Sequence, residues 1–380
     1  MQYLDLLFIL ESISVLIFLY PLFIGLLALK KRKKIKKSHH FPMVTVVVCA
    51  WNEEEFIKSC LNSLLNLNYP RYEIIVVCGG KDKTVRICQE YERLGKIRFI
   101  YERKRSGKWN SLNKAIRVAK GSTIALMDAD SIASENWLSR LIAPLNENIG
   151  ISCGRFIVKS TKNWLQKIVY VTNGLLNLLL LGFDSIGKIE VVSGSNMAFR
   201  KELHDKVKFK PVVLEDAFFV MESRSLGYGV RYSPDAVTHY QTVGSIKGLD
   251  SQLERLSRGS FEWAKKSVRH SKLIFVTLLL GFLFGFSSIF LIPSITLALA
   301  FKAYFLLAPP LILIFLFIIL QAIAKIADYR KYPKSNFLFF SLFMIPLLFG
   351  GLFLFLIYVL IKEIRKRPVI WLTSEKRLKK

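Results

Sequence analysis

The sequence predicts an α/β domain with a mostly parallel sheet, accompanied by apolar helices long enough to cross a membrane. Three observations predict this class. Short apolar runs alternate with amphipathic segments between residues 43 and 270, which is typical of a parallel sheet covered by helices. Long apolar stretches precede and follow this region. Hydrophobic residues make up 52% of the 380 residues and the mean hydropathy is +0.35, which is too apolar for an ordinary soluble protein.

The first element is an apolar stretch over residues 4–29, interrupted only by Asp5 and Glu11. At a rise of about 1.5 Å per residue it can cross a hydrocarbon layer about 30 Å thick. A cleaved signal peptide is the alternative, but the stretch lacks a basic start, and a basic run stands where a cleavage site should be. We therefore expect residues 1–40 to form a transmembrane helix with a basic flank.

The formal net charge of +27 allows either a nucleic-acid partner or a membrane flank. Seven of the eight residues from Lys30 to Lys37 are Lys or Arg, and they directly follow the apolar stretch. This placement indicates a cytoplasmic flank and contact with membrane lipids. No helix-turn-helix or RNA-recognition pattern accompanies the charge, so we expect no nucleic-acid partner. The five cysteines show no paired CxxC spacing and are interpreted as reduced thiols.

The middle region, residues 41–271, is the predicted cytoplasmic α/β domain. We expect strands at 44–49, 73–77, 98–101 and 123–128, with helices at 54–65, 83–94, 108–119 and 136–145. A later strand is expected at 189–192. Ligands of such sheets bind at the carboxyl ends of the strands.

Residues 164–183 are also apolar. A membrane span there would put the candidate site residues before and after it on opposite sides of the bilayer. The stretch is therefore interpreted either as a helix at the membrane interface or as a buried helix without membrane contact.

Three further apolar stretches cover residues 273–300, 303–324 and 337–361, within a predicted helical region at 272–361. Three crossings would place the basic tail, residues 362–380, outside the cell, against the positive-inside rule. Pro293, Pro309 and Pro310 allow one stretch to be re-entrant or interfacial instead. Both topologies remain open.

The strongest chemical signal is Asp128-Ala129-Asp130 at the end of an expected strand. Two carboxylates at this spacing can share a hard divalent cation and the diphosphate bound to it. Such a cation would neutralise a departing nucleoside diphosphate. An Asp-x-Asp sequence can also simply cap a turn.

Together with five other motifs, this pair resembles the inverting family 2 glycosyltransferases of GT-A fold. That group contains cellulose, hyaluronan and chitin synthases and the dolichol-phosphate sugar synthases. The resemblance covers residues 43–263. The motifs occur in the family's order: Val44-Thr-Val-Val-Val-Cys-Ala-Trp-Asn-Glu-Glu54, Gly107-Lys-Trp-Asn-Ser-Leu-Asn-Lys-Ala115, Asp128-Ala-Asp130, Gly194-Ser-Asn196, Leu214-Glu-Asp216 and Gln252-Leu-Glu-Arg255.

The resemblance implies a nucleotide-sugar donor, UDP- or GDP-linked, bound with Mg²⁺ or Mn²⁺. Asp128 and Asp130 would hold the metal, and His239 is either a third ligand or a partly buried histidine. Asn52 could instead cap a helix, and Lys108 could lie on a solvated face. The implied donor-binding residues are Ala50, Asn52, Glu53, Asp82, Lys108, Asn113, Asp128, Asp130, Gln252, Arg255 and Arg258.

The resemblance assigns Asp216 as the catalytic base, because an inverting transfer needs one carboxylate to take the proton of the attacking hydroxyl. Glu215 would orient this base or contact the acceptor, although both acids could merely stabilise a helix N-terminus. Gly194, Ser195 and Asn196 would form an acceptor loop, although a tight turn explains them almost as well.

Two segments depart from the family. Leu256 stands where processive synthases carry Trp, which disfavours polymer synthesis and leaves an amphipathic interface helix as the other interpretation of this segment. Cys78 and Gly79 stand where many relatives carry acidic residues that meet the donor base. The choice between uridine and guanosine therefore stays open.

We conclude from the sequence that the protein is an integral protein of the cell membrane with a cytoplasmic glycosyltransferase domain. The expected acceptor is a lipid phosphate, a lipid-linked saccharide or a glycan, because apolar helices accompany the catalytic domain. A processive polysaccharide synthase is the second interpretation. A catalytically inactive scaffold, or a transporter regulated by its soluble domain, would be expected to lack the key carboxylates, but Asp128, Asp130 and Asp216 are all present.

Overall fold

The computed structural model describes residues 2–30, 41–159, 161–190, 192–242, 246–267, 276, 279–280, 283–284, 286, 288–327 and 357. The chain forms two units that alternate along the sequence. The globular unit comprises Arg32–Ser160 and Gly187–Thr242, and the helical unit comprises Met1–Lys31, Thr161–Ile186 and Val243–Lys380. The predicted boundary residues 40, 271 and 361 lie outside the described residues, so the domain limits stay predictions.

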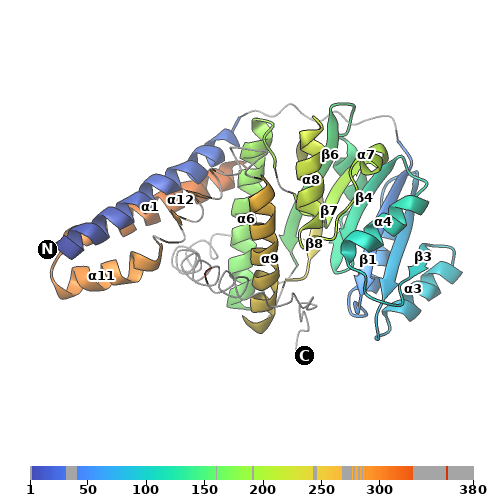
Figure 1. Cartoon of the computed structure of the whole chain (residues 1–380), viewed down its shortest axis with the longest axis horizontal. Coiled ribbons are helices and arrows are strands. Elements are labelled where there is room, and N and C mark those ends of the chain that lie inside the picture. Colours follow the sequence, from blue (N-terminus) through green and yellow to red (C-terminus); the bar gives the residue numbers. More distant parts are fainter. Residues whose placement is uncertain are drawn as a thin grey trace. The chain divides into compact units, whose positions relative to one another are not determined.

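The strands of the globular unit are β1 (Val44–Trp51), β2 (Tyr72–Gly79), β3 (Arg98–Tyr101), β4 (Thr123–Asp128), β5 (Ser131–Ala133), β6 (Ile149–Val158), β7 (Asn196–Arg200) and β8 (Gly229–Tyr240). Within the described residues they form one sheet in the order β3-β2-β1-β4-β7-β6-β8-β5 (Figure 1). The strands β3, β2, β1 and β4 are parallel, whereas β7 is antiparallel to both β4 and β6. This arrangement confirms the predicted α/β fold, with a mixed second half.

The helices of the globular unit are α2 (Ile57–Leu65), α3 (Thr84–Arg93), α4 (Lys108–Val118), α5 (Trp137–Ile142), α7 (Lys201–Lys206) and α8 (Glu215–Ser225). The core forms where their apolar stripes meet the sheet. Helix α2 buries Ile57, Leu61 and Leu64 at helical spacing, and all three are 0% exposed. Burying each such side chain contributes about 1.5–3 kcal/mol. This packing fixes α2 in the same hydrophobic core as the buried residues of β1.

The expected strand at 189–192 is wrong in position. Residues 189, 190 and 192 have no strand conformation, and β7 begins at Asn196, where it pairs with Met127. Ile189 and Val192 are nevertheless buried, at 1% and 5% exposure. Their burial explains why the apolar pattern predicted a strand here, because a buried connection also needs apolar side chains but no strand partners.

The described elements of the helical unit are α1 (Gln2–Leu27), α6 (Trp164–Ser185), α9 (Ile246–Ser267), the short 3₁₀ turns η1 (Ser288–Phe290) and η2 (Tyr304–Leu307), α11 (Leu291–Ala300) and α12 (Ala308–Ala327). Three stretches are long and apolar enough to cross a membrane: Tyr3–Leu27, Trp164–Ser185 and Tyr304–Ala327. One side of α1 exposes a continuous row of large apolar residues, which suits contact with lipid: Tyr3, Leu6, Ile9, Ile13, Leu16, Leu19, Phe23 and Leu26.

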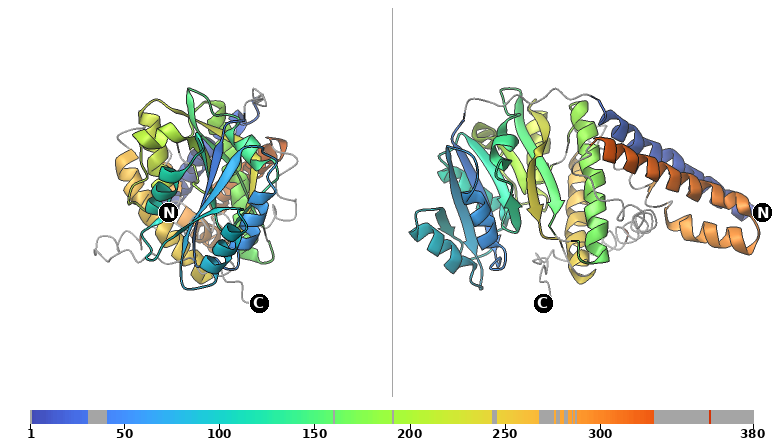
Figure 2. Two further views of the ribbon diagram at one scale, coloured as in Figure 1. Left: turned by 90° about the vertical axis from the view of Figure 1, so that its right-hand side faces the viewer. Right: turned by 180° about the vertical axis from the view of Figure 1, so that it is seen from behind.

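Helices α1 and α12 run side by side in the same direction (Figure 2). The ring of Phe8 lies 5.7 Å from that of Phe305, and the ring of Phe18 lies 6.2 Å from that of Phe317. The chain before α12 runs antiparallel to α1. Phe284 packs against Phe18, and the later residue Ala298 packs in a cluster near the start of α1. The stretch 273–300 is described only in part, and 337–361, apart from residue 357, lies outside the described residues, as does the tail at 362–380.

Helix α6 joins the helical unit at a close crossing with α1. A Cβ on Gly182 would lie 2.0 Å from the backbone oxygen of Ile24, so only glycine allows this approach. The chain enters α6 after β6 and returns to β7, and β6 and β7 are paired in one sheet. A single crossing by α6 would divide that sheet between the two sides of a membrane. The prediction that α6 does not cross the membrane, despite its length, is therefore kept.

Candidate active site

Strands β1, β2 and β4 end at one edge of the sheet. Their register pairs Trp51 with Gly79 and Cys49 with Asp128. The predicted site residues Asn52, Asp82 and Asp128, which end or follow these strands, are therefore gathered at this edge. Parallel α/β sheets bind their ligands at this position.

The two loops after β1 and β2 hold each other through predicted site residues. Asn52 has a left-handed backbone, φ 58°, and its Oδ1 accepts a hydrogen bond of 2.7 Å from the backbone N–H of Lys81. Asp82 accepts bonds from the backbone N–H groups of Glu54 and Thr84, at 3.1 and 3.0 Å. A left-handed conformation is costly for a residue other than glycine, so these bonds define the shape of the loop.

Two other predicted donor residues belong to the same loop region. Glu53 donates its backbone N–H to the hydroxyl of Thr84 at 2.7 Å. Ala50 is 5% exposed within β1, so its side chain packs in the core. The donor contacts of Ala50 and Glu53 stay predictions.

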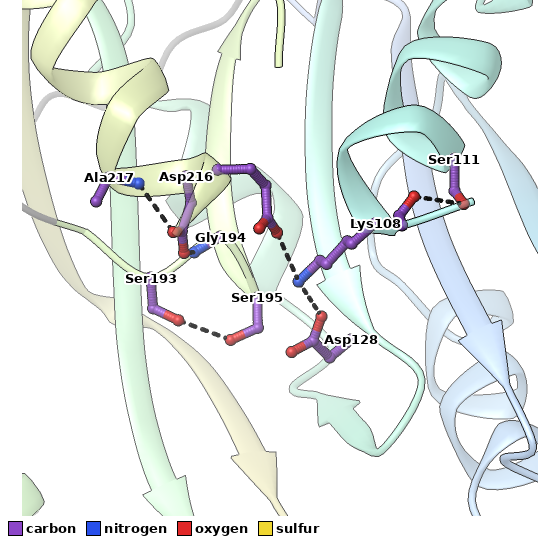
Figure 3. A network of polar contacts seen from close by, with 10 residues as sticks. Lys108, Ser111, Asp128, Ser193, Gly194, Ser195, Asp216 and Ala217 are labelled. Atoms are coloured by element: carbon purple, nitrogen blue, oxygen red, sulfur yellow. Dashed lines mark hydrogen bonds and ion pairs between the residues drawn. The ribbon is translucent and has the colours of Figure 1, made fainter. Parts of the chain in front are cut away.

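A lysine stands among carboxylates beside this corner (Figure 3). The Nζ of Lys108 donates to Asp128 Oδ1 at 2.6 Å and lies 3.9 Å from Glu215 Oε1. Burial opposes the charge on Lys108, but Asp128, Glu215 and Asp216 outweigh it and raise the pKa of the ammonium above its usual value. Lys108, at the start of α4, is therefore expected to carry its positive charge beside Asp128, the last residue of β4.

Glu215 is the most buried acid of this group, with a side chain that is 8% exposed. Burial raises the pKa of its carboxyl to about 7; the Lys108 cation opposes this rise and Asp216 adds to it. Burial therefore favours the protonated form of the Glu215 carboxyl.

Asp216 is fixed at the start of α8 by two backbone N–H groups. Its Oδ2 accepts from Gly194 at 2.6 Å and its Oδ1 from Ala217 at 2.8 Å (Figure 3). A Cβ on Gly194 would lie only 2.8 Å from the Cβ of Asp216, so glycine is required for the loop to come this close. A carboxylate has about four acceptor positions, so Asp216 keeps capacity to accept a proton from a substrate.

The acceptor-loop residues have different surroundings. Ser195 is partly exposed, and its hydroxyl lies 2.9 Å from that of Ser193. Asn196 is 0% exposed; its Oδ1 accepts from the Trp137 indole at 2.8 Å, and its Nδ2 donates to the backbone oxygens of Arg155 and Ala236. The Asn196 amide thus joins β7 to β6, β8 and α5, and its acceptor contact stays a prediction.

Asn113 also makes structural bonds. Its Nδ2 donates to the backbone oxygen of Phe209 at 2.9 Å, and its Oδ1 bonds to His204 and to the Phe209 N–H. The side chain ties α4 to α7 and the segment after it, and its donor contact stays a prediction. Gly107 and Lys108 remain the part of this motif that faces the strand ends.

Glu102 is a site-supporting residue that the sequence did not indicate. Its carboxylate accepts from Ser106 at 2.7 Å, from Ser111 at 2.8 Å and from Lys114 at 2.7 Å. These bonds fix the loop that leads into α4 and thus the position of Lys108. These three partners lie within the 12 residues after Glu102, but a lone Glu after a strand gives no signal of this kind.

The metal prediction rests on Asp128 and Asp130. Asp128 is 39% exposed in its side chain and Asp130 is 8% exposed overall. Carboxylate oxygens of this kind fit Mg²⁺ or Mn²⁺, which complete their coordination with water and substrate phosphate oxygens. Among the described residues no group of three His, Cys, Asp or Glu side chains is arranged to hold a metal on its own. His239 pairs with Ile132 on β5, and burial, reinforced by Lys159, lowers the pKa of its imidazole.

The remaining donor-site predictions fall on α9 of the helical unit. Arg255 is exposed, and Arg258 is 8% exposed and ion-paired with Glu254 at 3.0 Å. The side chain of Gln252 lies outside the described structure. The donor contacts of all three residues stay predictions.

Comparison with known proteins finds glycosyltransferases both among family models and among curated relatives. Residues 45–208 match the family model described as glycosyl transferase family 2. Poly-β-1,6-N-acetyl-D-glucosamine synthase from Staphylococcus epidermidis is 25% identical over 239 residues, which cover 61% of this chain and 58% of that protein. The probable glycosyltransferase YdaM from Bacillus subtilis (strain 168) is 28% identical over 244 residues, which cover 61% and 57%. The match thus spans less than two thirds of these relatives.

A solved structure extends the likeness to the fold. The mannosyltransferase PcManGT from Pyrobaculum calidifontis, in complex with GDP-Man and Mn²⁺, has a TM-score of 0.63 and 20% identity, covering 94% of this chain and 100% of that one. The mixed sheet, the carboxylates at its strand ends and the matching family model lead to one conclusion. The globular unit of this chain is a family 2 glycosyltransferase domain of GT-A fold.

Proposed function

We propose that the protein is an inverting glycosyltransferase that moves a sugar from a UDP- or GDP-linked donor to a lipid phosphate, a lipid-linked saccharide or a glycan at the cytoplasmic face of the cell membrane. The observation that carries this proposal is the position of Asp216. Two backbone N–H groups orient its carboxylate beside the cluster of Lys108, Asp128 and Glu215. A fixed base beside a cation and metal-type carboxylates is what a direct displacement at a sugar phosphate requires.

In this proposal the chain supplies orientation and charge. Asn52 and Asp82 hold the loops against which the nucleoside lies, and Lys108 faces the diphosphate. Asp128 and Asp130 would hold Mg²⁺ or Mn²⁺, which would supply positive charge against the leaving nucleoside diphosphate. Asp216 accepts the proton of the acceptor hydroxyl as that oxygen attacks the face opposite the diphosphate.

The direction of the helices supports the proposed orientation in the membrane. The carboxyl end of α1 leads into the basic run at Lys30–Lys37, and the carboxyl end of α12 carries Lys325. Because α1 and α12 run parallel, both basic ends lie on one side, which supports a cytoplasmic position by the positive-inside rule. The glycosyltransferase domain follows α1 directly and belongs on that side.

Processive polysaccharide synthesis is the second candidate. It is favoured by one specific observation, the likeness to a protein named as a poly-β-1,6-N-acetyl-D-glucosamine synthase. Against it stands Leu256, at the position where processive relatives place Trp. Transfer of one sugar to a lipid acceptor remains the first candidate.

A donor panel distinguishes these candidates. Detergent-solubilised protein is incubated with Mn²⁺, a lipid extract and a set of UDP- and GDP-sugars, and the lipid products are recorded by mass spectrometry. We expect release of nucleoside diphosphate from one donor and a lipid carrying a single added sugar. A ladder of products would replace the first candidate with the polymer synthase. Absence of both turnover and nucleotide binding would overturn the proposal.

A further inference from the structure

The Lys108 ammonium lies beside several carboxylates of the candidate active site. It lies 2.6 Å from Asp128 and 3.9 Å from Glu215, and Asp216 adds a third negative charge nearby. This ammonium places a positive charge directly on the strand-end carboxylate of Asp128. Its side chain is 30% exposed, so water and ions reach it.

The position of Lys108 in its helix is unfavourable for the helix itself. Lys108 is the first residue of α4. The N-terminus of a helix carries a partial positive charge, which disfavours a lysine at this place. The contacts with the carboxylates therefore account for Lys108, and helix stability does not.

A divalent metal on Asp128 and the Lys108 ammonium would compete for one carboxylate. Lysine is a compact charge on a flexible four-carbon stem, so the group can leave Asp128 without any change in the backbone. A nucleoside diphosphate offers the displaced ammonium a new anionic partner.

We propose that Lys108 is an internal counter-cation that holds the metal position of Asp128 until metal and donor diphosphate arrive together, and then transfers to the diphosphate. The inference rests on the proposed function. It assigns Lys108 a positioning role that makes binding of metal depend on the presence of nucleotide. Metal alone binds weakly, because a metal on Asp128 displaces the Lys108 ammonium, which then loses its principal partner and keeps only Glu215 nearby.

The test compares the affinity for Mn²⁺ alone in four forms of the full-length protein. Free Mn²⁺ is followed by electron paramagnetic resonance for wild type, Lys108→Gln, Lys108→Arg and Arg117→Gln. Arg117 is the matched control, because it is an exposed cation on the same helix, near its other end. We expect Lys108→Gln to bind Mn²⁺ about fivefold more tightly than wild type, the upper range for loss of a partly exposed ion pair. Lys108→Arg, which keeps the charge, and Arg117→Gln should stay close to wild type.

The affinity for nucleotide should change in the opposite direction. With Mn²⁺ present, UDP or GDP should bind more weakly to Lys108→Gln than to wild type, because the diphosphate loses its partner. A merely structural role for Lys108 would not strengthen one ligand and weaken the other. If Lys108→Gln alone does not fold, Lys108→Gln with Glu215→Gln is compared with Glu215→Gln, so that no buried acid is left without a cation.

Equal or weaker Mn²⁺ binding by Lys108→Gln would overturn the inference, and so would a lack of Mn²⁺ binding by both this variant and wild type. The donor panel separates this result from failure of the proposed function. Metal-dependent release of nucleoside diphosphate by wild type, with no gain in Mn²⁺ affinity in Lys108→Gln, would leave the function in place and reject only the role of Lys108.

Discussion

Asp216 and Glu215 are neighbours in sequence but have different surroundings. Asp216 is partly exposed and oriented by the N–H groups of Gly194 and Ala217, whereas Glu215 is buried beside Lys108. An oriented, accessible carboxylate suits a base that meets an acceptor hydroxyl. A buried acid beside a cation suits the control of local charge.

The first prediction concerns the base. Asp216→Asn keeps the size of the side chain and removes its ability to take a proton. We expect kcat to fall by about 10²–10⁴-fold, the usual contribution of a general base, with nucleotide affinity retained. Turnover is measured as released nucleoside diphosphate, and Asp205→Asn on the exposed side of α7 is the control. A fall of less than threefold in Asp216→Asn would remove the assignment.

The second prediction concerns the pH dependence of stability. Burial raises the pKa of Glu215 from 4.5 to about 7, so the folded protein holds this proton more tightly than the unfolded chain. The resulting stabilisation is complete below pH 4.5 and is lost as the pH rises through about 7. Thermal unfolding between pH 4.5 and 8 should therefore show a steeper loss of Tm for wild type than for Glu215→Gln. Parallel curves would contradict the shifted pKa.

Strand β7 is the element that joins the two halves of the sheet. Asn196 begins it and bonds to Trp137 on α5, to Arg155 on β6 and to Ala236 on β8. Because the side chain is fully buried, its removal would leave several polar groups without partners inside the protein.

We predict that Asn196→Ala destabilises the fold strongly. Each buried polar group left unpaired costs about 1–3 kcal/mol, and the Trp137 N–H is one of them. Ser195→Ala is the control, because the Ser195 hydroxyl bonds only to Ser193 among the contacts found for it. Denaturant unfolding should show a lower midpoint for Asn196→Ala alone. Equal midpoints would show that the amide has no structural role.

Local pattern accounts for what the sequence predicted in these elements. The strands β1 to β4 were predicted because each is a short apolar run, such as the one that contains Val44 and Val46. Helix α2 was predicted because its apolar residues, beginning with Ile57, recur at helical spacing. The second half was harder, since β6 and β8 pair across a gap of about 80 residues in sequence and their register shifts at Gly154/Arg155. The roles of Asn113 and Asn196 depend on partners from distant segments, so a motif match alone could not separate ligand contact from structural bonding.

At the scale of the whole molecule, the two units alternate along the chain because α6 leaves the sheet between β6 and β7. Within the helical unit, α1 and α12 run parallel. The proposed cytoplasmic position of the glycosyltransferase domain implies that the chain enters and leaves α6 on that same side.

We predict that both ends of α6 are reached from the cytoplasmic side. Lys162→Cys and Lys188→Cys flank the helix at exposed positions. A membrane-impermeant maleimide should label both in inside-out vesicles and neither in sealed right-side-out vesicles, with wild type as the background. Labelling of the two positions from opposite sides would show that α6 crosses the membrane.

The most direct test of the central claim is removal of the metal. Wild-type protein, supplied with its nucleotide sugar and lipid acceptor, is assayed for released nucleoside diphosphate before chelation, after EDTA treatment and after Mn²⁺ is returned. Asp128 and Asp130 then predict loss of release after chelation and recovery with Mn²⁺, while a cooperative thermal transition in EDTA shows that the chelated protein is still folded. Release that continues at the same rate in EDTA would contradict a metal-dependent transfer at this site.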